Sequence, residues 1–141
     1  MNVTLRLIKE DDLPLIQHYL SIEDVSRMTN VPEPYPPNGA KEWFGIVSEE
    51  HLLENHYPFT ILADDEFAGS ISVRREREGI GAIDYWVAPP FWKKGIGTKA
   101  AEQAVNFGRQ ALKRLKLAVL LRIEALPVFL RRSDFEKGRN L

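Results

Sequence analysis

The sequence predicts a mixed α/β (α+β) fold in which helices pack on one central twisted sheet. Five segments of the 141-residue chain alternate apolar and polar residues or form short β-branched runs, as strands do. Three other segments repeat apolar residues every three or four positions, which is typical of amphipathic helices. No repeat, low-complexity segment or linker interrupts the chain, so residues 1–141 are expected to form one domain.

The N-terminal part of the chain is expected to hold a strand, a helix and a loop. Residues 3–8 alternate and are rich in β-forming side chains, which predicts the first strand. A helix is expected over residues 13–20, and Asp11 or Asp12 can cap its first turn. Residues 30–39 contain a cluster of prolines and are expected to form a loop.

The middle of the chain is expected to add a second helix and three strands. These elements are the helix 40–54 and the strands 57–63, 67–74 and 82–88. The acidic turn Asp64-Asp65-Glu66 joins the first two of these strands as a hairpin. Gly79-Ile80-Gly81 is expected to break the chain before the third strand begins.

The C-terminal part is expected to hold one long helix and a last strand. Apolar residues recur at helical spacing from Ile96 to Leu115, and an apolar run covers residues 117–128. The predicted order of elements is therefore β-α-α-β-β-β-α-β. Residues 129–141 show no clean period.

Composition excludes several classes of function. The net charge of −1 argues against a general nucleic-acid binder, and the absence of cysteine excludes disulfides and thiolate chemistry. The histidines have no partners at metal-ligand spacing, so no metal is expected. Without a membrane-spanning run or a signal-peptide core, we expect no membrane partner and a cytoplasmic location. Acidic residues outnumber basic ones before residue 109. This excess is either ordinary solvated surface or the source of an electrostatic field that attracts a cationic amine.

The stretch IDYWVAPPFWKKGIGTKA, residues 83–100, is the most informative part of the chain. It predicts a buried strand, a Pro-Pro stop, an aromatic pair, two lysines and a glycine-rich turn that opens a helix. The first turn of a helix presents unpaired backbone N–H groups at the positive end of the helix dipole. Together with Lys93, Lys94 and Lys99, this turn indicates a site for a phosphate-bearing ligand.

Two phosphate motifs fit this stretch poorly. A P-loop needs a glycine five positions before the Gly-Lys pair, and the sequence here runs Gly97-Thr98-Lys99. Residues 95–100 do match the dinucleotide pattern G-x-G-x-x-A, and Glu124 ends a later strand. However, residues 89–94 separate the glycines from the preceding strand, and too few residues follow Glu124 for the β-α units which that fold requires.

The chain resembles the GNAT superfamily of acyl-CoA N-acyltransferases, in particular the branch of ribosomal-protein-alanine N-acetyltransferases. The resemblance covers residues 3–128. It rests on the segments LRLIKEDDLPLI, NVPEPYPPNGAKEWF, AIDYWVAPPFWKKGIGTKAAEQAVNF and LRIEALPV. The superfamily signature Q/R-x-x-G-x-G/A stands here as residues 92–97, WKKGIG, with Trp92 in place of Gln or Arg.

The resemblance implies that acetyl-CoA is the co-substrate and that it binds at the end of strand four. Backbone N–H groups from Lys94 to Thr98 would hold the pyrophosphate, and the strand end at Trp86–Val87 would pair with the pantetheine arm. A splay between strands four and five would admit that arm. The cofactor-binding residues it implies are Trp86, Val87, Trp92, Lys93, Lys94, Gly95, Ile96, Gly97 and Thr98.

The resemblance also implies the catalytic groups. A backbone N–H near Val87 would polarise the thioester carbonyl, and Glu124 or Asp84 would accept the proton of the amine. Each carboxylate has an alternative interpretation as part of an ion pair. Tyr57 and Tyr85 are candidate proton donors that fit equally well as core aromatics.

The C-terminal residues depart from the family pattern. Family members continue after strand five with a tyrosine-bearing helix and a hairpin, whereas this sequence has Phe135 at the tyrosine position and lacks the hairpin. We therefore expect an acetyl-CoA-dependent N-acetyltransferase that acts directly on a small amine or a protein N-terminus. The alternative is a truncated, non-catalytic acyl-CoA-binding or dimerising module. The unpaired apolar edge of strand five predicts a homodimer.

Overall fold

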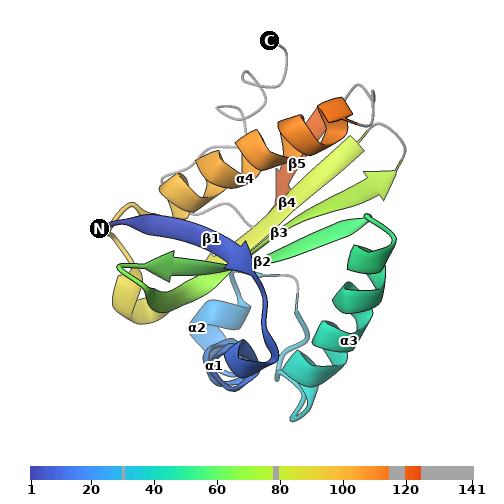
Figure 1. Ribbon diagram of the computed structural model, residues 1–141. Helices are drawn as coiled ribbons and strands as arrows, with labels where there is room; N and C mark the ends of the chain where they lie inside the picture. Colours follow the sequence, from blue (N-terminus) through green and yellow to red (C-terminus); the bar gives the residue numbers. More distant parts are fainter. Residues whose placement is uncertain (30, 78–79, 115–119, 125–141) are drawn as a thin grey trace.

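Five strands form a single sheet in the order β1-β2-β3-β4-β5 (Figure 1). The computed structural model describes residues 1–29, 31–77, 80–114 and 120–124. Neighbouring strands from β1 to β4 are antiparallel, and β5 is parallel to β4. The strands are β1 (Val3–Leu7), β2 (His56–Ala63), β3 (Glu66–Arg77), β4 (Ile80–Val87) and β5 (Leu120–Glu124).

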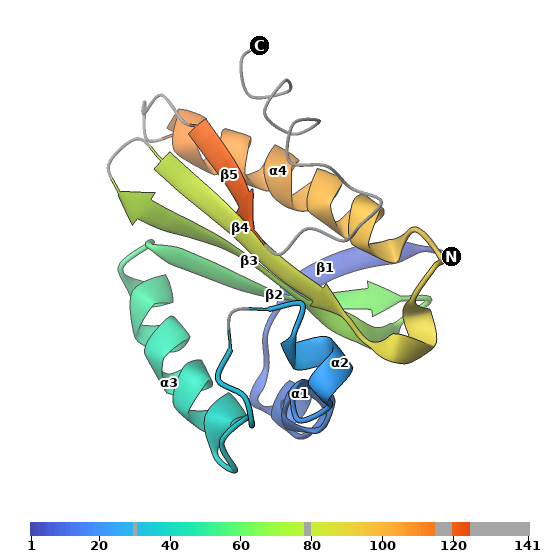
Figure 2. The ribbon, with the colours of Figure 1, turned by 180° about the vertical axis from the view of Figure 1, so that it is seen from behind.

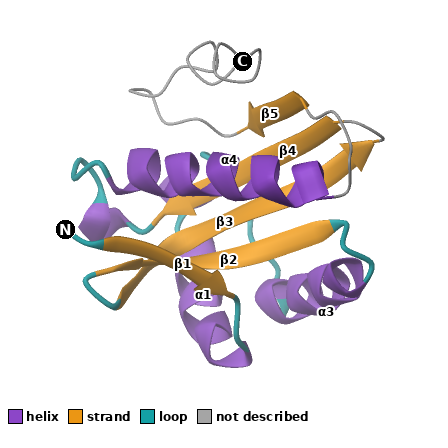
Figure 3. Cartoon of the chain, turned by 45° about the horizontal axis from the view of Figure 1, so that its top comes forward, coloured by secondary structure: helices purple, strands orange, loops and turns teal. Residues whose placement is uncertain are grey.

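Helices cover both faces of the sheet. The long helix α4 (Ile96–Arg114) lies across one face, and it contacts β1, β3 and β4 (Figure 3). The shorter helices lie on the opposite face (Figure 2). They are α1 (Leu13–Leu20), α2 (Glu23–Ser26) and α3 (Gly39–Leu52). Two 3₁₀ turns complete the described elements, η1 (Glu10–Asp12) and η2 (Pro89–Phe91).

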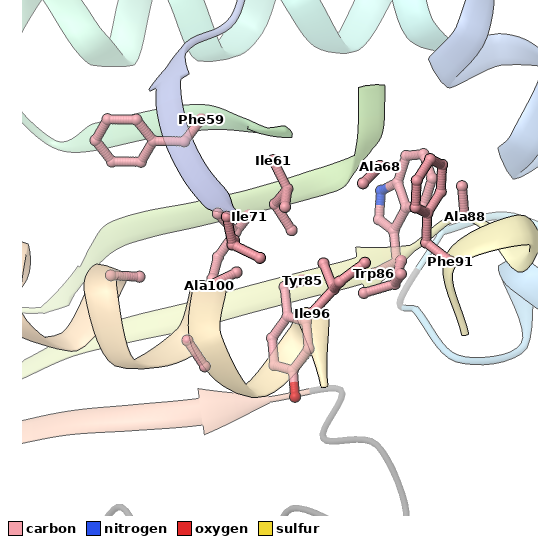
Figure 4. Close-up of a cluster of buried hydrophobic side chains, with 14 of the residues drawn as sticks. Phe59, Ile61, Ala68, Ile71, Tyr85, Trp86, Ala88, Phe91, Ile96 and Ala100 are labelled. Atoms are coloured by element: carbon pink, nitrogen blue, oxygen red, sulfur yellow. The ribbon is translucent and has the colours of Figure 1, made fainter. Parts of the chain in front are cut away.

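Alternation along the strands divides the side chains between the two helical layers. Tyr57 and Phe59 of β2 contact Phe107 of α4 with ring centroids 5.0 Å apart. Ile71, Tyr85, Ile96 and Ala100 form part of the same buried cluster (Figure 4). The residues between them in the strands face α1 and α3, because successive side chains point to opposite faces of a sheet. Each strand therefore contributes to two apolar layers.

The expected order of the main elements is confirmed, but the short elements, the start of β4 and the role of Asp12 differ from the prediction. The helix α2 and the 3₁₀ turns are absent from the prediction because such short elements have no full apolar period. The strand β4 begins at Ile80, so Gly81 lies inside the sheet, opposite Arg75, and does not interrupt it. The prediction was wrong there because pairing on both sides of Gly81 outweighs its low strand propensity.

The role expected of Asp12 is also wrong. Asp12 stands at the N-cap of α1 but makes no side-chain capping bond to that helix. Its carboxylate instead accepts hydrogen bonds from the Arg6 guanidinium, the Lys9 backbone N–H and the Thr60 hydroxyl, all at 2.8–2.9 Å. Tertiary partners on β1 and β2 thus replace the local cap.

Strand five is described only in part. The prediction covers residues 117–128, whereas β5 comprises Leu120–Glu124 and the remaining predicted positions lie outside the described residues. The register of β4 with β5 runs from Ile80–Leu120 to Asp84–Glu124. The strand β4 continues to Val87 beyond this pairing. The predicted splay concerns positions after Glu124, which are also outside the described residues.

Candidate active site

The segment after β4 forms a bent loop that delivers the chain to the start of α4. Pro89–Phe91 makes the turn η2, which ends the strand because proline cannot donate a ladder hydrogen bond. Lys93 and Gly95 then adopt positive φ angles of 62° and 74°. The left-handed conformation is unusual for lysine and readily adopted by glycine. The loop therefore follows a defined, partly strained path to α4.

The first turn of α4 presents backbone donors. The Lys99 N–H makes a hydrogen bond of 3.2 Å to the carbonyl of Gly95, the first bond of the helical pattern. The N–H groups of residues 96–98 precede this bond and have no carbonyl within the helix to receive them. Lys93 and Lys94 are exposed beside this turn, whereas the Ile96 side chain is 1% exposed and belongs to the core. The turn can therefore bind an anion through its backbone and its lysines.

The end of β4 has no strand partner on its outer edge among the described residues. The Ala88 N–H donates to the carbonyl of Ala68 at 2.7 Å, on the β3 side. Because successive N–H groups alternate between the edges of a strand, the Val87 N–H points toward the other edge, beyond the described pairing of β4 with β5. The Trp92 indole N–H donates to the carbonyl of Val87 at 2.6 Å. Trp92 thereby fixes the loop against the strand.

A pocket of about 640 Å³ lies between the sheet and the layer of α1 and α3. This volume is within the usual range for small-molecule sites. Apolar lining residues include Ile16, Leu20, Val31, Tyr35, Trp43 and Trp86. Polar lining residues from the strands are His56, Ser70, Ser72, Arg74 and Asp84. The pocket thus combines apolar walls with a polar row along the sheet.

The two predicted base candidates occupy neighbouring positions. Asp84 and Glu124 are partners in the β4–β5 register. The Asp84 carboxylate accepts a hydrogen bond of 2.6 Å from the Arg74 Nε, so its alternative role in an ion pair is realised. Its side chain is 37% exposed and lines the pocket, which leaves it accessible to a ligand. The structure therefore places the two predicted positions side by side on neighbouring strands, with Asp84 lining the pocket.

The predicted cofactor residues fall into two groups. Trp92 to Thr98 form the loop and the first turn of α4, next to the Val87 edge. The Trp86 side chain is separate from them, because it packs against Tyr19 and Phe67 and lines the pocket. Trp86 thus contributes a pocket wall through its ring, whereas its backbone carbonyl faces Gly69 of β3 and the outer strand edge belongs to Val87.

The candidate proton donors have different surroundings. Tyr57 packs edge-on against Phe107 and His51, which matches its alternative as a core aromatic. Tyr85 is 3% exposed, and its hydroxyl finds no hydrogen-bond partner among the described residues. Burial raises the pKa of Tyr85, so the phenol keeps its proton at neutral pH.

Sequence reasoning missed His56 and Arg74 as site residues. His56 was considered only as a metal ligand, and Arg74 only as the end of a strand. Alternation could have indicated part of this site, since Ser70, Ser72 and Arg74 occupy every second position of one strand and therefore share one face of the sheet. Their convergence with His56 depends on the β2–β3 register, in which His56 is opposite Arg74.

Within the described ranges, no group of three or more His, Cys, Asp or Glu side chains is arranged to hold a metal ion. No helix among the same residues is both long and apolar enough to cross a membrane.

Comparisons with solved structures identify the fold. A spermidine N-acetyltransferase from Vibrio cholerae, solved with CoA and spermine, superposes with a TM-score of 0.66 at 17% identity, covering 85% of this chain and 70% of that one. A ribosomal L7/L12 alpha-N-protein acetyltransferase in complex with coenzyme A gives a TM-score of 0.68 at 16% identity, over 87% and 70% of the two chains. A protein described as a probable acetyltransferase gives 0.71 at 19% identity, over 97% and 76%.

Sequence comparisons agree with the fold. None of the curated protein sequences matches this chain. The family model described as an acetyltransferase (GNAT) domain matches residues 2–126. Because that match includes all the described strands and helices, from β1 to β5, the chain belongs to the GNAT acetyltransferase family.

Proposed function

We propose that this protein is an acetyl-CoA-dependent N-acetyltransferase that acts on a primary amine, either a small amine or a protein N-terminus, by direct transfer. The observation that carries the proposal is the junction of β4 and α4. There, a strand edge at Val87 adjoins a helix N-terminus flanked by Lys93 and Lys94. Neither the described residues nor the comparisons favour the alternative of a non-catalytic module.

The loop fits the phosphates of coenzyme A. Backbone N–H groups of residues 96–98, the positive end of the α4 dipole and two exposed lysines together favour a pyrophosphate. The Val87 edge fits the amides of pantetheine, since an amide chain can pair with a strand edge. Acetyl-CoA is the acetyl donor of this family and supplies the acyl group as an activated thioester.

The pocket on the face of the sheet opposite α4 fits the acceptor. Asp84 lines it, and Glu124 is the register neighbour of Asp84 on β5. A carboxylate at either position would accept the proton that the amine loses. The Val87 N–H would donate to the carbonyl oxygen as charge develops on it. The neighbours' acceptors, spermidine and a ribosomal protein N-terminus, are both primary amines, which supports this substrate class.

We also propose that the protein is a homodimer whose interface includes β5 or the C-terminal tail. The strand β5 is the last one of the described sheet. An apolar strand at the end of a sheet tends to pair with another chain, and a two-fold dimer is the commonest closed solution.

Substitution of Gly97 tests the cofactor site. Gly97→Glu places a side chain and a negative charge in the first turn of α4, so we expect it to abolish coenzyme A binding in calorimetry. Gly45→Glu is a matched control, because Gly45 lies in α3 with open space around its Cβ position. Equal affinities of Gly97→Glu and wild type would refute the site. Acetyl transfer to an amine panel tests the activity itself.

A further inference from the structure

The pocket beside Asp84 has walls that restrict the kind of acceptor it can hold. Tyr35, Trp43 and Trp86 place three aromatic rings around it, and Ile16 and Leu20 of α1 add aliphatic surface. Aromatic and aliphatic walls of this kind bind apolar groups by removing their surface from water. An acceptor without an apolar body would leave these walls unused.

The charged side chains among the described lining residues of the pocket are already paired. Asp84 is the one acidic side chain among the described lining residues, and it accepts the 2.6 Å hydrogen bond from Arg74. At the rim, Arg27 pairs with Glu23 one turn before it in the chain. A second positive charge on an acceptor would therefore lose its water without meeting an unpaired carboxylate on these walls, which is unfavourable.

His56 supplies a polar group at the sheet side of the pocket. The residue is 6% exposed, and its Nε2 has no hydrogen-bond partner among the described residues. Its Nδ1 lies 3.6 Å from the Glu50 carboxylate, which is longer than a hydrogen bond. Burial lowers the pKa of His56 although Glu50 and Asp84 act in the opposite direction, so the imidazole is neutral near pH 7. A neutral imidazole both donates and accepts hydrogen bonds.

The register sets the separation between His56 and Asp84. The two residues are two strands and two register positions apart, because His56 is opposite Arg74 and Asp84 is opposite Ser72. Strand spacing and residue rise place their Cα atoms about 12 Å from each other. An acceptor can therefore lie between them with one polar group at each end.

We propose that the acceptor is a primary amine with an apolar body of aromatic size, whose amine lies beside Asp84 and whose far end carries a neutral polar group that hydrogen-bonds to His56. The proposal rests on the proposed acetyltransferase function and adds its substrate class. Polyamines are disfavoured by the same walls, because no described residue that lines the pocket offers their second cation an unpaired carboxylate.

Calorimetry with three amines tests the proposal. The probes are phenethylamine, tyramine and spermidine, titrated into the full chain with and without coenzyme A. We expect phenethylamine to bind at least about tenfold more tightly than spermidine, a difference of about 1.4 kcal/mol. Tyramine differs from phenethylamine by one hydroxyl and should bind several-fold more tightly still, because that hydroxyl can reach His56.

Two variants assign these preferences to residues. Trp43→Ala should lower the affinity for both aromatic amines by at least about tenfold. Ile46→Ala changes an exposed position on the same helix and should leave both affinities unchanged. His56→Leu should abolish the advantage of tyramine and preserve phenethylamine binding. Thermal melts check that each variant is folded.

The outcomes separate this proposal from the proposed function. If the wild-type protein does not bind coenzyme A, the cofactor site and the proposed acetyltransferase function are both refuted. Normal coenzyme A binding with spermidine bound as tightly as the aromatic amines, or with no aromatic amine bound, would overturn the acceptor class alone. Equal binding of tyramine and phenethylamine by wild type would overturn the role of His56.

Discussion

Asp84 and Glu124 are carboxylic acid residues that lie opposite each other in the β4–β5 register, and Asp84 is hydrogen-bonded to Arg74. Arg74 donates a charged hydrogen bond to the Asp84 carboxylate, which holds that carboxylate in a fixed orientation. Glu124 is the stronger candidate for the base in the family resemblance. The roles of the two carboxylates can be compared directly, since Gln and Asn are amides of nearly the same shape as Glu and Asp.

The first prediction assigns the base. Glu124→Gln should lower kcat by about 10²-fold or more while coenzyme A affinity stays near wild type, because an amide cannot accept the proton of the amine. Asp84→Asn serves as the comparison at the adjacent position. Full activity of Glu124→Gln in a steady-state assay would move the role to Asp84 or to a water relay.

A second residue-scale prediction concerns Asp12. Burial acts to raise the pKa of Asp12, but hydrogen bonds from Arg6, the Lys9 backbone and Thr60 outweigh it and hold the pKa below its ordinary value. The resulting stabilisation is present above the unfolded-state pKa near 3.9 and is lost as the pH falls through the folded-state value. Asp12→Asn should lower the free energy of unfolding at pH 7 by about 3–5 kcal/mol.

The pH dependence distinguishes this network from simple packing. The stability of wild type in urea unfolding should fall as the pH drops below about 4, and Asp12→Asn should lose much less stability over the same acid range. Asp11→Asn is the control, because Asp11 is an exposed neighbour. Parallel pH curves for wild type and Asp12→Asn would contradict the network's contribution.

At the scale of elements, β3 and β4 approach closely where β4 ends. Gly69 is opposite Val87 in the register, and a Cβ at Gly69 would lie 2.2 Å from the Trp86 carbonyl oxygen. That contact is with backbone, so a side chain at this position requires the strands to separate. The same strands position the Val87 edge and the Trp86 wall of the pocket.

Gly69→Ala should therefore destabilise the protein by about 1–3 kcal/mol, as overpacking does in other cores. The matched control is Gly45→Ala in α3, where a Cβ meets open space and alanine should stabilise the helix by about 0.5–1 kcal/mol. Urea midpoints of the two variants should shift in opposite directions. An unchanged midpoint for Gly69→Ala would contradict the close approach.

At the scale of the whole molecule, the sheet formed by the described residues has β1 at one edge and β5 at the other. We expect light scattering at micromolar concentration to give the mass of a homodimer. Removal of residues 129–141 should lower the melting temperature if the tail contributes to the interface. A monomeric mass together with an unchanged melting temperature after truncation would contradict this assembly.

Local signals in the sequence determined most of the architecture. Apolar spacing in α1, α3 and α4 and alternation in the strands act within short windows, so the order of the main elements could be predicted. The glycine-rich turn before α4 was also readable, because a helix N-terminus, two glycines and adjacent lysines are contiguous in the chain. The position of the proposed phosphate-binding loop therefore needed no tertiary information.

Only the tertiary structure decided which side chains meet. Arg74 and Asp84 pair across the β3–β4 hairpin, and His56 joins them from β2, through registers that no short window contains. The same registers put Glu124 next to Asp84, although forty positions separate them in the sequence. The physical reason is that strand pairing is a non-local contact, so the pocket exists only once distant segments have been brought into register.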